Sequence, residues 1–488
     1  MTYKLHQVIF IIAIIWYALT AYLSIGYFHP DEHYQIIEFA GIIDGTNSAK
    51  DLAWEYNAQI RPATQPVICY LIFKACDFIS IANPYDKAFV LRLLTGLLSV
   101  VAICFFTNSC KKLILDKNWK WFLFLSYFIW FLPFINVRFS SETWSGIALL
   151  LAVALVVRNI SSYQSYLILG CLLGFSFLFR FQIAFAALGL VFWLIFRKKE
   201  AKSKIAVMMA SGIAIVAIGV LIDSWFYGDW VLTFVNYFRA YLIGQKTAEF
   251  GALPWFYFID KIFNSLFPIG FLVLISFLFL LFKKYDSVFI WTVLPFLFFH
   301  SFIYHKEFRF LFPVINFVPV IIFLAIKEVP PVKWINPPGK IIKGLLILIL
   351  IVNLLGVIVA SIIPAGDGRI RIAQKIHEIN TKKMITIYFA DNSNPFSPWW
   401  LTTNFYTPQN AKFKKIDFSR KNDIPGIDDN VRNIIVVSMK DIQNREIQNF
   451  ITGLNMKEQC KSVPEFLIPL LKISNIYRTK DILVMYSD

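Results

Sequence analysis

Long apolar runs separated by short polar or basic breaks make up most of the first 363 residues. The first run, residues 8–27, has about 20 residues, the length that a helix needs to cross a bilayer core. Since no small-residue cleavage site follows it, we expect a retained anchor rather than a signal peptide. Further runs follow at residues 88–110, 119–136, 142–157, 163–179, 182–196, 204–222, 262–282, 287–304, 310–326 and 341–363. The pattern predicts an all-α polytopic membrane protein with about eleven spans.

The pattern changes after residue 363. Short β-rich runs lie at residues 384–390, 433–439 and 481–487, and polar helical patterns lie at 369–380 and 440–452. We therefore expect a transmembrane domain at residues 1–363 and a small α/β domain at residues 364–488. The sequence of this tail contains no nucleophile triad, phosphate-binding loop or metal-ligand cluster. A cap over a membrane site, a part in acceptor choice and a purely structural lid all remain open for it.

Basic clusters indicate the orientation of the spans. They lie in alternate loops, at Lys111–Lys112, Arg197–Lys199, Lys283–Lys284, and Lys333 with Lys340. Loops beside membrane spans carry an excess of Lys and Arg on the cytoplasmic side, so we place these loops and the amino terminus inside. Parity then puts residues 28–87, 223–261, 305–309 and 364–488 on the outer face.

Composition and charge support the same class of protein. Hydrophobic residues make up 58% of the chain and aromatic residues 17%, more than in an ordinary soluble protein. The formal net charge is +16, but the basic residues cluster at the ends of apolar runs, where anionic lipid headgroups are the expected partners. We therefore expect contact with membrane lipids and no binding of nucleic acid. The six cysteines show neither a disulfide framework nor zinc-ligand spacing.

The first external loop, residues 28–87, opens with the motif His29–Pro30–Asp31–Glu32–His33–Tyr34–Gln35. Pro30 suits a first helical position, and the apolar positions after it predict a short amphipathic helix along the membrane surface. Residues 66–81 predict a second interfacial helix, since this run is short for a span. Asp31 and Glu32 fall in a first helical turn, where acids stabilise the helix dipole. This explanation and a catalytic role are both open at this point.

A second polar group, His305–Lys306–Glu307–Phe308–Arg309, lies between two apolar runs. Ionisable side chains at membrane depth are costly and usually mark a ligand site or a pathway. Lys306 and Arg309 are three residues apart and could face one anion together, for which phosphate is the obvious candidate. The alternative is snorkelling to the interface together with an internal Lys–Glu pair.

The loop at residues 223–261 carries a third polar group, in which Asp223 precedes a series of aromatic residues. The aromatic residues suit an interfacial belt, whereas Asp223 suggests a substrate hydrogen bond or a partner at a helix end. Weaker candidates for substrate contact are Arg61, Gln35 and Arg138. For Arg138, a salt bridge in an interfacial turn is an equal alternative. Arg180 is best explained as the polar turn of a hairpin.

These groups resemble glycosyltransferase family 22 of the GT-C superfamily, which holds the lipid-linked mannosyltransferases of N-glycan precursor and GPI-anchor assembly. The likeness covers about residues 1–325 and rests on His29–Glu32, Asp223 with Phe226–Gly228, Phe250–Gly251 before Pro254–Trp255, and His305–Phe310. The last of these, a His-Lys-Glu-x-Arg-Phe element, is the most specific. Eukaryotic members carry a Cys-His-Ser-Thr-Pro element, and residues 390–395 match it only in Ser and Pro, which favours a bacterial or divergent member.

The resemblance implies an inverting hexosyltransferase, first of all a mannosyltransferase, with a polyprenyl- or dolichyl-phosphate sugar donor. The acceptor would be a lipid-linked glycan or glycolipid at the external or luminal face. Asp31 would be the catalytic base, while Glu32 shares the proton or orients the acceptor. The donor phosphate would be bound by His305, Lys306 and Arg309. No cofactor is certain, and a divalent cation at Asp31, Glu32 and Asp223 stays open.

Two alternatives remain beside this interpretation. Intramembrane charge and many spans also suit a flippase or transporter of lipid-linked sugars, although no broken helices in matching halves stand out. Another GT-C enzyme, such as an aminoarabinose-type or protein-glycosylating transferase, would share the acidic first loop. The element at residues 305–310 argues against both. We expect the bacterial inner membrane, or the endoplasmic reticulum membrane in a eukaryote.

Overall fold

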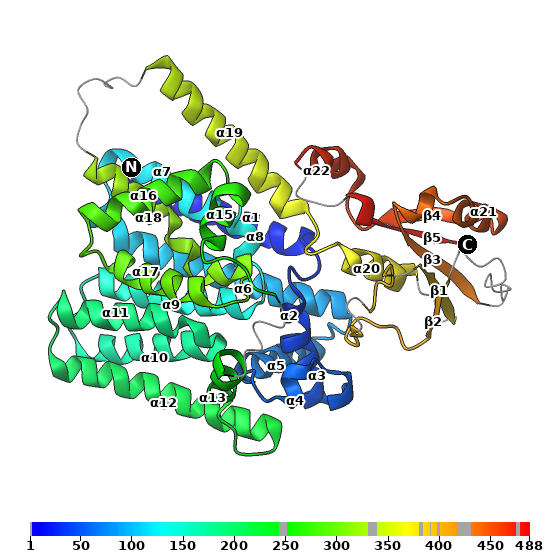
Figure 1. Ribbon diagram of the computed structural model, residues 1–488, viewed down its shortest axis with the longest axis horizontal. Coiled ribbons are helices and arrows are strands. Elements are labelled where there is room, and N and C mark those ends of the chain that lie inside the picture. Colours follow the sequence, from blue (N-terminus) through cyan, green and yellow to red (C-terminus); the bar gives the residue numbers. More distant parts are fainter. Residues whose placement is uncertain are drawn as a thin grey trace. The chain divides into compact units, whose positions relative to one another are not determined.

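The computed structural model describes residues 2–243, 251–329, 339–379, 384–390, 392–397, 401–416, 431–474 and 479–488. Most of these residues are helical, and a five-stranded sheet forms from the last hundred residues (Figure 1). The sequence interpretations that rest on Phe250, Lys333 and Asp391 lie outside the described residues. The chain forms two compact units. The first contains Met1–Thr20, Ala58–Val67 and Arg92–Ala360, and the second contains Ala21–Asn57, Ile68–Leu91 and Ser361–Asp488.

Helices make up the first unit. Those that lie wholly or mostly in it are α1 (Thr2–Leu23), α6 (Pro84–Cys110), α7 (Trp119–Phe128), α8 (Leu132–Asn136), α9 (Ser141–Val157), α10 (Tyr163–Phe179), α11 (Ala184–Phe196), α12 (Lys202–Tyr227), α13 (Thr233–Phe238), α15 (Tyr257–Ser265), α16 (Ile269–Lys283), α17 (Val288–Phe302), α18 (Val318–Glu328) and α19 (Lys340–Ile362). A 3₁₀ stretch, Phe308–Phe317, leads into α18. Each predicted apolar run contains helix, so the prediction of an all-α membrane domain is confirmed at this level.

Five helices of the described part are long and apolar enough to cross a membrane. They are Lys4–Leu23, Pro84–Leu113, Lys202–Tyr227, Phe308–Glu328 and Lys343–Ile362. Five shorter apolar helices of 10–17 residues accompany them: Ser141–Val157, Tyr163–Phe179, Phe181–Phe196, Ile269–Lys283 and Val288–Phe302. The structure thus supports several spans by length and composition, and the number of eleven stays a prediction.

The predicted run at residues 119–136 is broken in the structure. The chain leaves the helix after Phe128 and re-enters it at α8, whose first turn holds Pro133. A helix end leaves main-chain groups without helical partners, which is costly in an apolar environment. Asn353 of α19 compensates this cost, because its side-chain amide donates to the Phe128 carbonyl (2.7 Å) and accepts from the Trp130 N–H (3.0 Å).

Reciprocal hydrogen bonds join the start of helix α9 to the end of helix α10. The Ser145 hydroxyl donates to the Ser176 carbonyl, and the Ser176 hydroxyl donates to the Ser145 carbonyl, both at 2.8 Å. Small residues also allow α10 to approach α12, since a Cβ at Gly170 would lie 2.0 Å from the Met208 carbonyl oxygen. Close helix packing through small and hydroxyl residues is typical of membrane helices.

The second unit contains the helices of the predicted first loop. They are α2 (Pro30–Glu32), a π turn (His33–Ile37), α3 (Glu38–Asp44), α4 (Trp54–Asn57) and α5 (Thr64–Phe78), of which α5 begins in the first unit. The predicted helix after the acidic motif is confirmed, with His29 as its N-cap residue and Pro30 in its first turn. The predicted helix at residues 66–81 corresponds to α5. Their interfacial placement stays a prediction.

The sheet of the second unit has the strand order β2-β1-β3-β5-β4. Its strands are β1 (Ile385–Phe389), β2 (Ala411–Lys415), β3 (Arg432–Ser438), β4 (Lys457–Lys461) and β5 (Leu483–Ser487), and the helices of this region are α20 (Arg369–Ile379), α21 (Arg445–Gly453) and α22 (Ile468–Ser474). Strand β1 pairs in parallel with β2 and β3, while β5 pairs antiparallel with β3 and β4. The predicted α/β class of this region is therefore confirmed.

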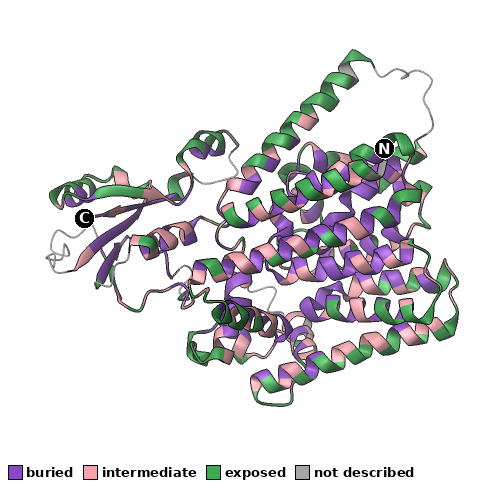
Figure 2. Cartoon of the chain, turned by 180° about the vertical axis from the view of Figure 1, so that it is seen from behind, coloured by how far each residue is buried: buried purple, intermediate pink, exposed green. Residues whose placement is uncertain are grey.

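Alternation along the central strands explains how helices cover both faces of the sheet. Ile434 and Val436 of β3 pack with α20 on one face, and Ile435 and Val437 pack with α21 on the other. Strands with parallel neighbours are usually buried on both faces and rich in β-branched residues. The purple central strands of Figure 2 show this burial.

Candidate active site

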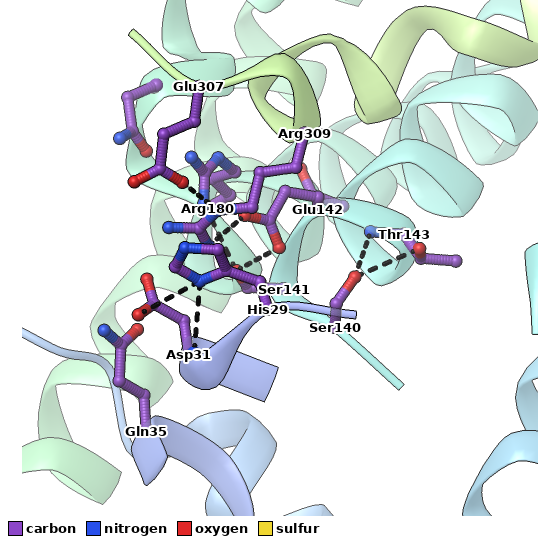
Figure 3. A network of polar contacts seen from close by, with 12 residues as sticks. His29, Asp31, Gln35, Ser140, Ser141, Glu142, Thr143, Arg180, Glu307 and Arg309 are labelled. Carbon is purple, nitrogen blue, oxygen red and sulfur yellow. Dashed lines mark hydrogen bonds and ion pairs between the residues drawn. The ribbon is translucent and has the colours of Figure 1, made fainter. Parts of the chain in front are cut away.

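A buried carboxylate bridges two guanidinium groups in the first unit. Glu142 Oε1 lies 2.7 Å from Arg309 Nη1 and 2.8 Å from Arg180 Nη1. All three side chains are at least nine-tenths buried. Figure 3 shows the Glu142 carboxylate with dashed contacts to both arginines. Buried charges are stable only when they are paired in this way, so the three residues form one unit.

Local helix geometry places each member of this group. Ser140 caps α9 by accepting a hydrogen bond from the Thr143 N–H (3.2 Å), which puts Glu142 in the first turn, where the helix dipole favours an acid. Arg180 is the C-cap residue of α10 and has an extended backbone. It lies at the break between α10 and the short 3₁₀ turn that leads into α11, and its role as the polar turn of a hairpin stays a prediction. The sequence interpretation missed its ion pair with Glu142.

The group continues through the element at residues 305–310. Glu307 has an extended backbone, and in extended chain alternate side chains point to the same side. His305 Nε2 accordingly lies 2.7 Å from Glu307 Oε1, and Arg309 Nε pairs with Glu307 Oε2. Arg309 is thus held by two carboxylates at once, and His305, Glu307, Arg309, Glu142 and Arg180 form a continuous polar chain.

Lys306 has different partners from Arg309. Its ammonium donates to the main-chain carbonyls of Leu253 (2.7 Å) and Ile303 (2.5 Å), and the residue is buried. Burial lowers the pKa of Lys306, because desolvation disfavours the charged form. Lys306 and Arg309 thus have different partners in the described residues, and their joint contact with one anion stays a prediction.

Asp223 holds the chain segment that carries Arg61. Its Oδ1 accepts from the Ala63 N–H at 2.7 Å, its Oδ2 accepts from the Thr233 hydroxyl at 2.5 Å, and the residue is buried. Tyr227, one turn later on α12, donates to the Arg61 carbonyl at 2.8 Å. These contacts favour the helix-end role that the sequence left open for Asp223.

The remaining candidates of the first unit are held by aromatic rings. The Arg61 guanidinium lies 5.8 Å from the centre of the Tyr237 ring, and its Nη2 lies 3.5 Å from the Tyr241 hydroxyl. Arg138 is fully buried, with its guanidinium 4.8 Å from the Phe134 ring centre. Arginine above an aromatic face gains a cation–π interaction. Arg138 is thus a packed side chain of the first unit.

The acidic pair belongs to the second unit. His29 Nδ1 accepts from the Asp31 N–H at 3.2 Å and lies 3.4 Å from the Asp31 carboxylate, contacts that Figure 3 marks with dashed lines. Glu32 accepts from the Phe28 N–H at 3.2 Å and is buried, whereas the Asp31 side chain is 21% exposed. The two adjacent acids therefore differ: Glu32 braces the start of the helix, whereas the Asp31 side chain is partly exposed.

Gln35, on the same helix, donates from its side-chain amide to Glu55 Oε1 at 3.1 Å. Both residues are buried in the second unit, so the contact orders α4 against the first-loop helix.

The sequence offered three carboxylates to a divalent cation, those of Asp31, Glu32 and Asp223. Within the residues that the structure describes, no group of three or more His, Cys, Asp or Glu side chains has the arrangement of a metal site. Both carboxylate oxygens of Asp223 in addition accept hydrogen bonds from other residues of the chain.

Comparison with known proteins gives a family match over most of the chain. Residues 8–396 match the Alg9-like mannosyltransferase family. A curated relative, GPI alpha-1,2-mannosyltransferase 3 of Bos taurus, is 24% identical over 318 residues, which cover 65% of this chain and 58% of the bovine protein. The chain thus matches less than two thirds of the length of this relative.

Solved structures show the same fold at low sequence identity. The crystal structure of ArnT from Cupriavidus metallidurans bound to undecaprenyl phosphate has a TM-score of 0.55 and 11% identity, with 98% of this chain and 97% of that chain covered. The oligosaccharyltransferase of Archaeoglobus fulgidus has a TM-score of 0.50 and 11% identity, with 92% and 70% covered. At this identity the likeness concerns the fold alone.

Proposed function

Because the chain belongs to the Alg9-like mannosyltransferase family, we propose that it transfers mannose from a polyprenyl- or dolichyl-phosphate donor to a lipid-linked glycan or glycolipid. The observation that carries the proposal is the chain of polar contacts around the buried Arg309, which is built largely from the most specific motif of the sequence. The family match favours sugar transfer over the movement of an unchanged lipid.

The donor chemistry requires cations more than a strong acid. A polyprenyl phosphate is a good leaving group, and its departure places negative charge on phosphate oxygens that fixed cations stabilise. We assign this role to Arg309, with Arg180 beside it through Glu142. A guanidinium has five N–H donors in a rigid plane, so one that is oriented by carboxylates can still bind phosphate oxygens. His305 contributes by fixing Glu307.

The acceptor chemistry requires a base. We assign it to Asp31, whose side chain is partly exposed, with Glu32 as the residue that orders the helix start. The acceptor hydroxyl oxygen forms the new bond to the anomeric carbon as the bond from that carbon to the phosphate oxygen breaks. The hydroxyl proton passes to the Asp31 carboxylate, and the polyprenyl phosphate leaves with the bonding electron pair. Direct displacement of this kind inverts the anomeric configuration.

The number of spans, the side of the membrane on which sugar is transferred and the identity of that membrane are part of the same proposal. We infer about eleven spans, with the ten apolar helices of the described part as the main contributors, and the sugar transfer at the external or luminal face. The membrane would be the bacterial inner membrane, or that of the endoplasmic reticulum in a eukaryote.

An assay with lipid extraction tests this function. Purified protein in liposomes is supplied with radiolabelled polyprenyl-phosphate mannose and a membrane lipid extract as the acceptor source. We expect the label to move to a new lipid-linked product in a protein-dependent manner. Label that crosses the vesicle membrane on its original lipid, with no new product, would instead identify a flippase.

A further inference from the structure

A buried ion pair next to the acidic motif has no part in the mechanism above. His33 Nε2 lies 2.6 Å from Glu38 Oε1, and neither side chain is exposed. An α-helix has 3.6 residues per turn, so side chains five positions apart point about 140° away from each other. The π turn at His33–Ile37, in which the Glu38 N–H donates to the His33 carbonyl, brings the two side chains together.

The C-terminal part of the second unit completes this pair. Glu38 Oε1 accepts from the Phe405 N–H at 3.2 Å, and the Tyr406 ring stacks on the His33 imidazole with centroids 5.2 Å apart and an angle of 15°. The Tyr34 hydroxyl, next to His33, donates to the Leu401 carbonyl at 2.9 Å. Residues 401–406, which we name the 401–406 segment, therefore contact both the π turn and the Glu38 residue that follows it.

The buried Glu38 carboxylate of the His33–Glu38 pair depends on its contacts with residues 401–406, because it needs hydrogen-bond donors in place of water. A carboxylate without solvent is costly unless hydrogen bonds satisfy its oxygens. Glu38 receives such bonds from His33, from the Asn47 side-chain amide (2.6 Å) and from the Phe405 N–H. Displacing the 401–406 segment removes one of these donors and uncovers the His33 ring. The segment and the π turn are therefore coupled.

We propose that the 401–406 segment is a positioning element for catalysis, which holds the π turn and thereby the direction of the Asp31 side chain. Asp31 lies two residues before His33 on the same continuous helix, so loss of the π turn rotates the acidic motif relative to α3. Tyr406, His33 and Glu38 are positioning residues that touch no substrate. The inference rests on the proposed function for the role of Asp31, and it gives the C-terminal domain a part in turnover.

Steady-state kinetics test the catalytic side. In the mannose transfer assay, Tyr406→Leu is expected to lower kcat on the order of 10- to 100-fold, as misplacement of a reacting group does, while KM for the donor stays within about two-fold. The matched control is Phe413→Leu, the same loss of an aromatic ring from the same domain, with no expected change. Since Tyr406 acts through Glu38, the double variant with Glu38→Gln should be no slower than the slower single variant. Full additivity would overturn the coupling.

Hydrogen–deuterium exchange of the intact protein provides a readout that needs no activity. Tyr406→Leu should raise amide exchange at residues 33–40 and leave α9 unchanged, while Phe413→Leu changes neither. If the wild type transfers no mannose but this exchange pattern appears, the proposed function fails and the coupling stands. If exchange at residues 33–40 stays at the wild-type level, or rises equally in α9, the positioning role is wrong and the proposed function is untouched.

Discussion

The two polar groups of this protein differ in how their charges are compensated. In the first unit, Arg180 and Arg309 share one oxygen of Glu142, and Arg309 also pairs with Glu307. In the second unit, Asp31 keeps partial exposure beside His29. Carboxylates that fix guanidinium groups prepare them to bind an anion, whereas an accessible carboxylate is ready to accept a proton. Under the proposed function, leaving-group stabilisation and base catalysis fall to separate local structures.

Among the variants that test this comparison, Glu142→Gln is expected to have the largest effect, which is a loss of stability. The change leaves two buried guanidinium groups without their shared carboxylate, and breaking a buried ion pair costs on the order of 3–5 kcal/mol. At about 2–4 °C per kcal/mol, the Tm measured by thermal shift should fall by roughly 10 °C. The matched control is Glu328→Gln, which removes a more exposed pair with Lys284 and should shift Tm by about 2 °C or less. Equal shifts for both variants would show that the Glu142 group contributes no special stability.

A smaller and more selective effect is expected from Arg309→Gln. If the guanidinium binds the donor phosphate and stabilises its departure, its loss removes a charge-assisted hydrogen bond worth about 1.5–3 kcal/mol, so kcat/KM for the donor should fall roughly 10- to 100-fold. KM for the acceptor should change much less in the folded fraction of the variant. Arg197→Gln, which removes an arginine that packs on Tyr285 and Trp291, serves as the control. Equal weakening of donor and acceptor would argue against a phosphate role.

Sequence patterns predicted the elements of the two regions better than the contacts between their residues. The apolar runs gave α9 and α10, and the β-rich runs gave β1, β3 and β5, since these elements are buried and their periodicity is strong. Strand β2 was not predicted because Lys412, Lys414 and Lys415 make it a hydrophilic edge strand, which is how natural sheets protect their edges.

The contacts needed information that a local pattern does not carry. Glu142 pairs with Arg309 across 167 positions, and no periodicity links such distant residues. His33 and Glu38 are close in sequence, yet a regular helix would separate them, so only the π turn reveals their pairing. A charged residue at the edge of an apolar run, as Glu142 and Arg180 both are, was the one available signal.

The most direct test of the account compares Asp31→Asn with Asp44→Asn in the mannose transfer assay. The two changes remove the same charge from the same continuous helix, but Asp44 is an exposed residue paired with Lys74 at its far end. The account predicts that Asp31→Asn lowers kcat by at least about 100-fold, as expected for loss of a general base, with normal folding and donor KM, and that Asp44→Asn is near the wild type. Transfer by Asp31→Asn at the wild-type rate would contradict the central claim.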